Sequence, residues 1–370
     1  MRIGLDARFW DLKNAGLGRY TQELVKNLLK LDHKNEYFLL LNPKDAESFD
    51  LEADNLQVVK IDSPHYSVME QVRMPFEIAR LKLDFVHFLS FNHPILWPGK
   101  FLVSIHDLTL YLYPARSRKS ILHRWAMSVV VADAAGRANH IFALSENTKK
   151  DIVKKFSINP DKITITYLGV PSNLKMLPKS RVQAFIKKKK IATPFLFYVG
   201  QWRAHKNLIR LVRAFELAKK TAKTDFKLVI GGKPDPDYSQ LLIAIAKSPV
   251  KKDIIIPGFI SDEELPYWYN AATAFIFPSL YEGFGLPVLE AAKCGTPVLS
   301  SNSSSLPEVL GEAALYFDPK SIKQMAKLMN KIVDDPKLRE ELKAKGLKKA
   351  EEFSYQNVAK KILNVYNKIK

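Results

Sequence analysis

Two glutamates, Glu282 and Glu290, enclose a glycine-bearing stretch whose residue types suit a ligand with a sugar at one end and a phosphate at the other. An apolar run precedes the stretch, and a helix is predicted from about Leu286, with Pro287 in its first turn, where proline is tolerated. Carboxylates accept hydrogen bonds from sugar hydroxyls, while free backbone amides at a helix start bind phosphate. We interpret the stretch as a sugar-phosphate site. The alternative makes Glu290 a surface helix residue and Glu282 a helix cap.

Arg203 and Lys206 form a second candidate site, because they directly precede a helix predicted over residues 208–220. Cations are unfavourable at a helix N-terminus. Such a local conflict is typical of a place where an anionic ligand supplies the missing negative charge. We therefore favour an anion-binding pair over a solvated surface.

Two further turns carry glycines and a histidine. Gly16 and Gly18 precede a predicted helix, and glycine there allows backbone amides to approach an anion closely. The third glycine of the dinucleotide-binding fingerprint is absent, so a purely structural turn explains them equally well. His106 follows the apolar run Phe101–Ile105. A histidine at a strand end is more often structural than catalytic, but its position at a carboxyl end favours function.

All these turns belong to one repeating pattern, in which a short apolar run is followed by a turn and then by a helix-length amphipathic segment. Alternating strands and helices predict parallel sheets covered on both faces. Residues 171–194 separate two such series, so we expect two doubly wound α/β domains, with ligands at the carboxyl ends of the strands. The expected strands are residues 2–5, 37–41, 57–61, 85–88, 101–105 and 141–143 in the first series, and residues 195–199, 227–230, 254–257, 274–277 and 297–300 in the second.

The composition excludes several classes of protein. The chain has 370 residues, of which 47% are hydrophobic and 26% charged, as in soluble globular proteins with ample core. A single cysteine, Cys294, excludes a disulfide framework and a cysteine-based zinc cluster. No apolar run reaches the ~18 residues of a membrane-spanning helix, and the N-terminus lacks the apolar core of a signal peptide. We expect a cytoplasmic protein.

The net charge of +19, from 57 Lys and Arg against 38 Asp and Glu, favours polyanionic partners: phosphorylated small molecules, anionic lipids or nucleic acid. Lysines scattered over amphipathic helices are more often a solvated face than a binding stripe. No nucleic-acid motif with interleaved aromatic residues is present, and we expect no nucleic acid partner.

A basic segment with aromatic residues nearby lies at residues 116–137, which begin with Arg116, Arg118 and Lys119 and include Trp125. A solvated helix start is the simpler interpretation of this segment. The alternative is a peripheral contact with anionic headgroups at the inner face of a membrane.

Taken together, these motifs resemble the family 4 retaining glycosyltransferases, the glycosyl transferases group 1. The similarity in order and spacing covers nearly the whole chain, and the Glu-x7-Glu stretch is its most specific element. One departure is that many members place an arginine where this chain has Gln201, directly after the glycine that ends the first strand of the second domain. Other members carry a Trp-Arg-x-His-Lys-Asn form like this one, in which His205 is a candidate to share the role of Arg203. Further matching runs are residues 145–148, 167–170 and 304–309.

The resemblance implies the GT-B architecture, with two Rossmann-like domains facing each other across a cleft. It implies an N-terminal acceptor-side domain at residues 1–172, a nucleotide-sugar domain at residues 173–352 and a C-terminal helix, residues 353–370, that crosses back to the first domain. It also implies roles for the candidate residues: donor-phosphate binding (Gly16, Gly18), contact with the transferred sugar (His106), neutralisation of the diphosphate (Arg203, Lys206), binding of sugar hydroxyls (Glu282, with the amides of Gly283, Phe284 and Gly285) and binding of the ribose (Glu290).

The implied activity is transfer of a hexose from a nucleotide-diphosphate sugar, either GDP-mannose or a UDP-sugar, to a glycan or lipid-linked glycan acceptor with retention of configuration. The leaving diphosphate gains negative charge, which cations, a helix N-terminus and glycine amides stabilise. No Asp-x-Asp metal pair lies at an expected strand end, and Asp235-Pro236-Asp237 is interpreted as a turn, so we expect neither a metal nor a cofactor. Same-face attack is favoured over a covalent intermediate on Glu282.

Two other functions remain open. One is a nucleotide-sugar epimerase or hydrolase on the same scaffold. The other is a basic protein that binds nucleic acid or a membrane surface and has no enzymatic activity.

Overall fold

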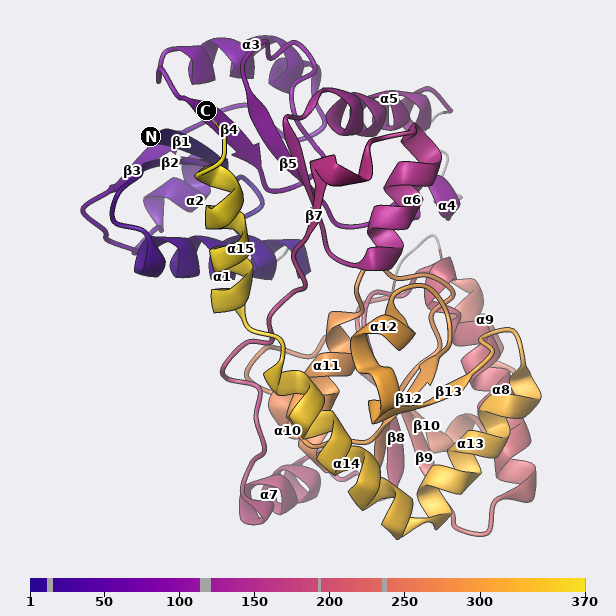
Figure 1. Ribbon diagram of the computed structural model, residues 1–370. Helices are drawn as coiled ribbons and strands as arrows, with labels where there is room; N and C mark the ends of the chain where they lie inside the picture. Colours follow the sequence, from indigo (N-terminus) through magenta and orange to yellow (C-terminus); the bar gives the residue numbers. More distant parts are fainter. Residues whose placement is uncertain (12–15, 114–120, 192–193, 235–237, 370) are drawn as a thin grey trace. The chain divides into compact units, whose positions relative to one another are not determined.

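The computed structural model describes residues 1–11, 16–113, 121–191, 194–234 and 238–369. Contacts within the chain divide it into two compact units. Among the described residues, unit 1 comprises those up to residue 169 together with residues 354–369, and unit 2 comprises residues 170–353. Strands and helices alternate along both units, as the sequence pattern predicts (Figure 1).

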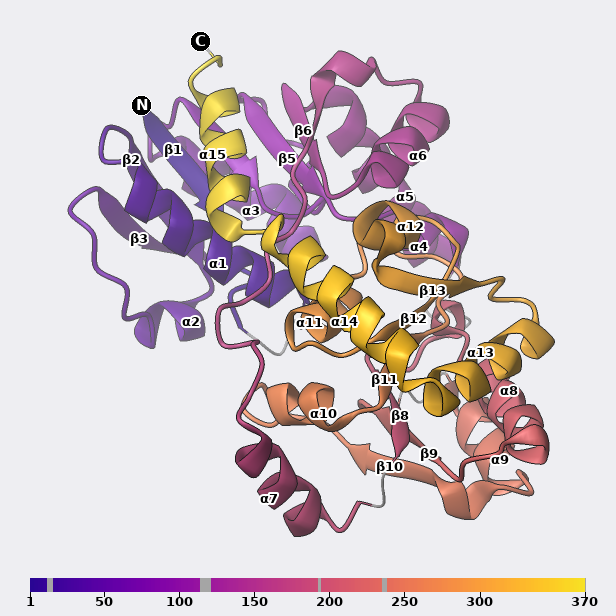
Figure 2. The ribbon, with the colours of Figure 1, turned by 60° about the horizontal axis from the view of Figure 1, so that its bottom comes forward.

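Unit 1 is built on a parallel sheet with the strand order β3-β2-β1-β4-β5-β6-β7. The order reverses between β1 and β4, which makes this the switch point where doubly wound sheets bind ligands. Helices α1 and α15 lie side by side on one face, and α3 and α5 lie on the other (Figures 1 and 2). The strands are β1 (Arg2–Asp6), β2 (Glu36–Leu41), β3 (Leu56–Lys60), β4 (Phe85–Phe88), β5 (Phe101–Ile105), β6 (His140–Ala143) and β7 (Ile163–Ile165). The α-helices are α1 (Gly16–Leu31), α2 (Pro43–Glu47), α3 (Val68–Ala79), α4 (Thr109–Leu112), α5 (Ile121–Arg137), α6 (Glu146–Phe156) and α15 (Tyr355–Tyr366).

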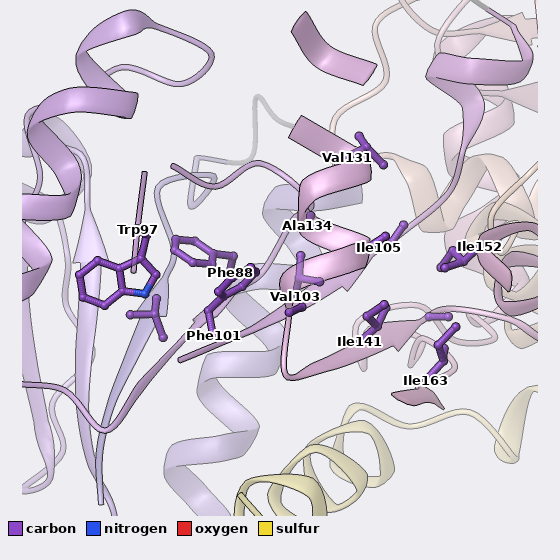
Figure 3. Close-up of a cluster of buried hydrophobic side chains, with 14 of the residues drawn as sticks. Phe88, Trp97, Phe101, Val103, Ile105, Val131, Ala134, Ile141, Ile152 and Ile163 are labelled. Atoms are coloured by element: carbon purple, nitrogen blue, oxygen red, sulfur yellow. The ribbon is translucent and has the colours of Figure 1, made fainter. Parts of the chain in front are cut away.

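The inner strands of this sheet, β1, β4, β5 and β6, are buried along most of their length, because helices cover both of their faces. Every residue of β5 is buried. Figure 3 shows Val103 and Ile105 of β5 packed with Ile141 of β6 and with Val131 and Ala134 of α5. This packing fixes the carboxyl end of β5, from which His106 follows.

Unit 2 repeats the architecture, with a parallel sheet in the order β10-β9-β8-β11-β12-β13 and a reversal between β8 and β11. Helices α8, α9 and α13 pack together, as do α7, α10, α11 and α14 (Figure 1). The strands are β8 (Phe195–Val199), β9 (Lys227–Gly231), β10 (Ile254–Gly258), β11 (Ala274–Phe277), β12 (Val298–Ser301) and β13 (Ala314–Phe317). The α-helices are α7 (Lys179–Lys189), α8 (Leu208–Thr221), α9 (Gln240–Ala246), α10 (Leu265–Ala271), α11 (Leu286–Lys293), α12 (Leu306–Leu310), α13 (Ile322–Asp334) and α14 (Pro336–Glu351).

Aromatic side chains form much of the core beneath the strand ends of unit 2. The ring of Trp268 stacks on Phe197 with the centroids 5.7 Å apart. Tyr269 meets Phe275 edge-on at 5.3 Å, and Phe275 stacks on Phe277 at 5.7 Å. Because these rings belong to α10, β8 and β11, they hold the two strands at the switch point in register.

The prediction of two Rossmann-like, doubly wound parallel-sheet domains is confirmed. Two strands, β7 and β13, were absent from the predicted set. Both lie at sheet edges, and two residues of each are only partly buried. Across the described part of the chain, no helix is both long enough and apolar enough to cross a membrane.

Candidate functional site

The loop between β11 and α11 contains Gly285, whose backbone conformation is strained for any residue with a Cβ atom. Gly285 caps α11 with a left-handed φ of 95°. A Cβ atom at this position would collide with the side chain of Leu306. Pro287 lies in the first turn of α11, as predicted, so the backbone amides of the loop precede a helix N-terminus.

Two serines after β12 hold this loop in place. The backbone N–H of Glu282 donates to the Ser304 hydroxyl at 2.9 Å. The buried Ser305 hydroxyl is shared between the carbonyl oxygens of Glu282, at 3.0 Å, and Phe284, at 2.9 Å. The backbone around Glu282 is therefore fixed before any ligand binds.

Lys206 and Glu282 meet at the switch point of unit 2. The Lys206 ammonium donates to both carboxylate oxygens of Glu282, at 2.6 and 2.9 Å. The two side chains are only 16% and 11% exposed, and the ammonium lies 5.5 Å from the ring centre of Phe277. An ammonium has three N–H donors and each carboxylate oxygen has two lone pairs, so the pair retains capacity for a phosphate oxygen and for sugar hydroxyls.

The loop after β8 carries Lys206 in a short 3-10 helix, Ala204–Lys206, directly before α8. Asn207 follows in a left-handed conformation, and its buried side-chain amide donates to the carbonyl oxygens of Pro278, at 3.0 Å, and Pro319, at 2.7 Å. The backbone N–H of Leu280 donates to the His205 carbonyl at 2.8 Å. These bonds tie the loop after β8 to the loops after β11 and β13, and so fix the distance between Lys206 and Glu282.

His205 does not share a cationic role with Arg203. Its side chain is 6% exposed. Burial, together with the nearby charges of Lys206 and Arg203, lowers the pKa of His205 to about 3. The imidazole is therefore neutral at physiological pH, whereas Arg203 is exposed at the N-terminal cap of the 3-10 helix.

Glu290 lies within α11 and is 3% exposed, which rules out the interpretation as a surface helix residue. The Tyr269 hydroxyl donates to its carboxylate at 2.9 Å. A carboxylate held in this way is oriented by the protein and retains further lone pairs for hydroxyl groups.

In unit 1, Gly16 and Gly18 occupy the start of α1 and differ in their surroundings. A Cβ atom on Gly18 would lie 2.5 Å from the Asp11 carbonyl oxygen, so this glycine is required for close packing of α1 against the loop after β1. Among the described residues, which do not include residues 12–15, no atom lies within 4 Å of a Cβ atom built on Gly16. The contacts of Gly18 explain its presence structurally, whereas no described contact requires a glycine at position 16.

His106 follows β5, and its ring is fixed by two neighbours. Its Nε2 lies 2.8 Å from the Leu89 carbonyl oxygen, and its ring meets Tyr20 edge-on with the centroids 4.6 Å apart. Burial is the main cause that lowers the pKa of His106 below its usual value, so the ring is neutral. Because a carbonyl only accepts, Nε2 carries the hydrogen and Nδ1 carries a lone pair that can accept a hydrogen bond.

Several functional positions were not identified from the sequence. Asn207, Ser304 and Ser305 shape the site through backbone contacts, and Tyr269 orients Glu290. Asn207 carries a sequence signal, since an asparagine before a helix suits a left-handed residue. Ser304 and Ser305 belong to the family-matching run at residues 304–309, but that run predicts no role for either serine.

Some predictions concern residues that the structure does not describe. Asp235, Pro236 and Asp237 lie outside the described residues, as do Arg116, Arg118 and Lys119. Within the described ranges, no group of three or more His, Cys, Asp or Glu side chains is placed to hold a metal ion.

Two family models together span most of the chain. The model for glycosyl transferases group 1 matches residues 180–349, within unit 2. The model for glycosyltransferase family 4 matches residues 15–174.

Curated relatives and solved structures agree with these models. The O-antigen chain mannosyltransferase B of Escherichia coli is 29% identical over 95% of this chain and 96% of its own length. The MMP alpha-(1->4)-mannosyltransferase of Mycolicibacterium hassiacum is 28% identical over 68% of this chain and 59% of its own length. The fold is similar to that of the sucrose-phosphate synthase of Thermosynechococcus elongatus (TM-score 0.80, 18% identity, 100% and 99% of the two chains covered). It is also similar to that of Anabaena Alr3699/HepE solved with UDP-glucose (TM-score 0.77, 14% identity, 99% and 99% covered).

Proposed function

Since the chain belongs to glycosyltransferase family 4 and is a glycosyltransferase, we propose that it transfers mannose from GDP-mannose to a hydroxyl of a glycan or lipid-linked glycan acceptor. The names of the relatives support mannose over another hexose, since several are mannosyltransferases and the E. coli protein acts on an O-antigen chain. A UDP-sugar is the alternative donor.

The observation that carries this proposal is the pairing of Lys206 with Glu282 at the carboxyl ends of β8 and β11. In the proposed complex, Lys206 and Arg203 neutralise the diphosphate while Glu282 accepts hydrogen bonds from hydroxyls of the sugar. The N-terminus of α11 and the amides of Gly283, Phe284 and Gly285 add fixed positive ends of dipoles. Charge develops on the leaving diphosphate as the glycosyl bond breaks, so groups placed there in advance lower the barrier.

We propose roles for three further residues, Glu290 in unit 2 and His106 and Gly16 in unit 1. The Nδ1 lone pair of His106 accepts a hydrogen bond from a hydroxyl of the transferred sugar, and its neutral ring takes no part in proton transfer. Gly16, which has no side chain, lets the backbone approach the donor phosphate closely, and Glu290 binds the ribose hydroxyls.

We propose same-face attack with retention of configuration, in which the leaving phosphate takes the proton of the acceptor hydroxyl. Glu282 is held by Lys206 through both of its oxygens, which suits a hydrogen-bonding role better than attack on the anomeric carbon. We also propose that no metal ion is required, because the cations and amides of the site supply the charge that a metal would supply.

Product analysis tests these proposals together. With GDP-mannose and an acceptor glycan, the expected product is an α-linked mannoside, and its configuration is read from the NMR coupling of the anomeric carbon and proton. Free mannose or an epimerised nucleotide sugar formed equally with and without acceptor would instead support the hydrolase or epimerase. Activity lost to a chelator and restored only by a divalent ion would contradict metal independence.

We propose in addition a peripheral contact between unit 1 and an anionic membrane. Apolar side chains are exposed on α4 and α5: Leu110 (50%), Leu112 (51%), Trp125 (64%) and Val129 (36%). Arg116, Arg118 and Lys119 lie shortly before α5 in the sequence, and basic residues of this kind favour an anionic surface. A lipid-linked acceptor would be found at such a surface.

A further inference from the structure

A chain of hydrogen-bonded side chains crosses the interior of unit 1. The hydroxyls of Tyr20 and Ser104 lie 2.9 Å apart, Ser104 Oγ lies 3.0 Å from His87 Nε2, and His87 Nδ1 lies 2.6 Å from the Tyr366 hydroxyl. All four side chains are completely buried. They belong to α1, β5, β4 and α15, which lie far apart in the sequence.

This series of four hydrogen-bonded side chains contains no charged group. Burial, with smaller effects from His106 and His140, lowers the pKa of His87 to about 3, so the ring is neutral. A neutral imidazole has one N–H donor and one lone pair, which suits a position between two hydroxyl groups. In the interior such satisfied polar groups hold one another in a single arrangement, because breaking a bond would leave a buried group without a partner.

Tyr20 connects this buried chain to the site. Its hydroxyl is held by Ser104, and the planes of the Tyr20 and His106 rings are almost perpendicular, at 89°. Ser104 lies in β5 and His106 directly follows the strand, and both side chains contact Tyr20. The Leu89 carbonyl holds the imidazole from another direction through Nε2.

We propose that Tyr20 is a positioning residue for His106, whose imidazole it holds in the plane that directs Nδ1 toward a hydroxyl of the transferred sugar. This inference rests on the proposed function of His106. Tyr20 itself touches no substrate, and it acts only through the ring beside it. The hydroxyl of Tyr20 fixes its ring through Ser104, and the ring fixes the imidazole.

A double-mutant cycle between positions 20 and 106 tests the proposal. Tyr20→Leu removes the ring, and we expect kcat to fall about 10-fold or more, because a small misplacement at a reacting centre is costly. Tyr20→Phe keeps the ring and removes only its anchor, so we expect a fall of about threefold, in line with a partial loss of an aromatic contact. In a His106→Ala background both substitutions should change kcat by less than about twofold, since the residue through which they act is gone.

Two further readouts separate positioning from a general loss of structure. Tyr20→Leu should change kcat and the KM for the donor in the same pattern as His106→Ala. Tyr37 of β2 serves as a matched control, because it is a completely buried tyrosine of the same unit whose hydroxyl donates to Asp32 at 2.6 Å. Tyr37→Leu should lower the melting temperature in a similar way and leave kcat within about twofold.

The proposal would be overturned if the fold-losses in kcat of the single variants at positions 20 and 106 multiplied in the double variants. A Tyr20→Leu protein with normal kcat would overturn it as well. Should Tyr20→Leu fail to fold, the conservative Tyr20→Phe variant decides the matter alone through its coupling to His106. A wild-type protein without transferase activity toward any donor would refute the proposed function instead, so the two failures are distinguishable.

Discussion

Two lysines of unit 2, Lys206 and Lys219, form ion pairs at different ends of the sheet. Comparing them separates the effect of an ion pair on stability from its effect on the reaction. Lys206 pairs with Glu282 after β8, whereas Lys219 pairs with Asp225 and Asp253, which precede β9 and β10. The lysine side chains are 16% and 11% exposed. The two lysines are therefore comparable in burial, but of these two only Lys206 lies at the carboxyl ends of the strands, where ligands bind.

We predict that Lys206→Ala lowers kcat/KM at least ~100-fold, because removing one preorganised electrostatic donor typically costs that much. Lys219→Ala is the matched control: it should lower the melting temperature and leave turnover within about twofold. Steady-state kinetics and thermal unfolding of both variants check this. Near-normal turnover of Lys206→Ala would remove Lys206 from the site.

At the scale of the elements, the loop from β11 to α11 depends on one backbone conformation. We predict that Gly285→Ala destabilises the protein by about 1–3 kcal/mol, because a residue with a Cβ is strained at its positive φ. The collision with Leu306 should also displace the loop and reduce kcat/KM about 10-fold or more.

Gly311 is the control for this prediction. It also has a positive φ, of 53°, but no atom of the described part of the chain lies within 4 Å of a Cβ atom built there. Gly311→Ala should therefore lose stability and keep its activity. Equal loss of activity in both variants, measured by steady-state kinetics, would show that backbone strain alone is responsible.

The buried histidines predict a dependence of stability on pH. The pKa values of His87 and His205 are both lowered to about 3 by burial, whereas an unfolded chain binds these protons near pH ~6.5. Between these values the unfolded state binds more protons, so the free energy of unfolding falls as the pH falls, by up to about 1.4 kcal/mol per pH unit for each histidine. Carboxyl groups whose pKa is lowered, such as that of Asp133, lose their contribution only below pH ~4.

Denaturant unfolding at pH 7.5 and pH 5 checks this prediction, and His87→Gln should make the dependence shallower. A free energy of unfolding that stays level or rises between pH 7 and pH 5 would contradict it.

The order of strands and helices follows from the sequence pattern because buried parallel strands are continuous apolar runs. The edge strands β7 and β13 are not among the predicted strands, although both carry apolar residues. In the same way, the residue types predicted Lys206 and Glu282 as site residues, whereas the roles of Asn207 and Ser305 depend on contacts with loops distant in the sequence. A single sequence does not show which distant loop each of these side chains contacts.

At the scale of the whole molecule, the net charge of +19 favours binding to anionic surfaces. We predict that the protein co-sediments with vesicles containing phosphatidylglycerol, that salt weakens this binding, and that Trp125→Ser reduces it, because exposed aromatic and basic groups bind anionic interfaces. Phe259 of unit 2, which is 67% exposed, provides the control: Phe259→Ser should leave binding unchanged. Equal binding to neutral vesicles would contradict an electrostatic contact.

The central claim is that the charged pair at the switch point of unit 2 binds a nucleotide-diphosphate sugar. The most direct test is thermal unfolding of the wild-type, Lys206→Ala and Lys219→Ala proteins with GDP, UDP, ADP and their sugar conjugates. At a ligand concentration a hundredfold above its dissociation constant, the wild-type and Lys219→Ala proteins should be stabilised by about 2.7 kcal/mol by GDP and GDP-mannose. Lys206→Ala should require far more ligand for the same shift. No stabilisation by any nucleotide diphosphate, together with a salt-sensitive shift on random DNA, would contradict the account.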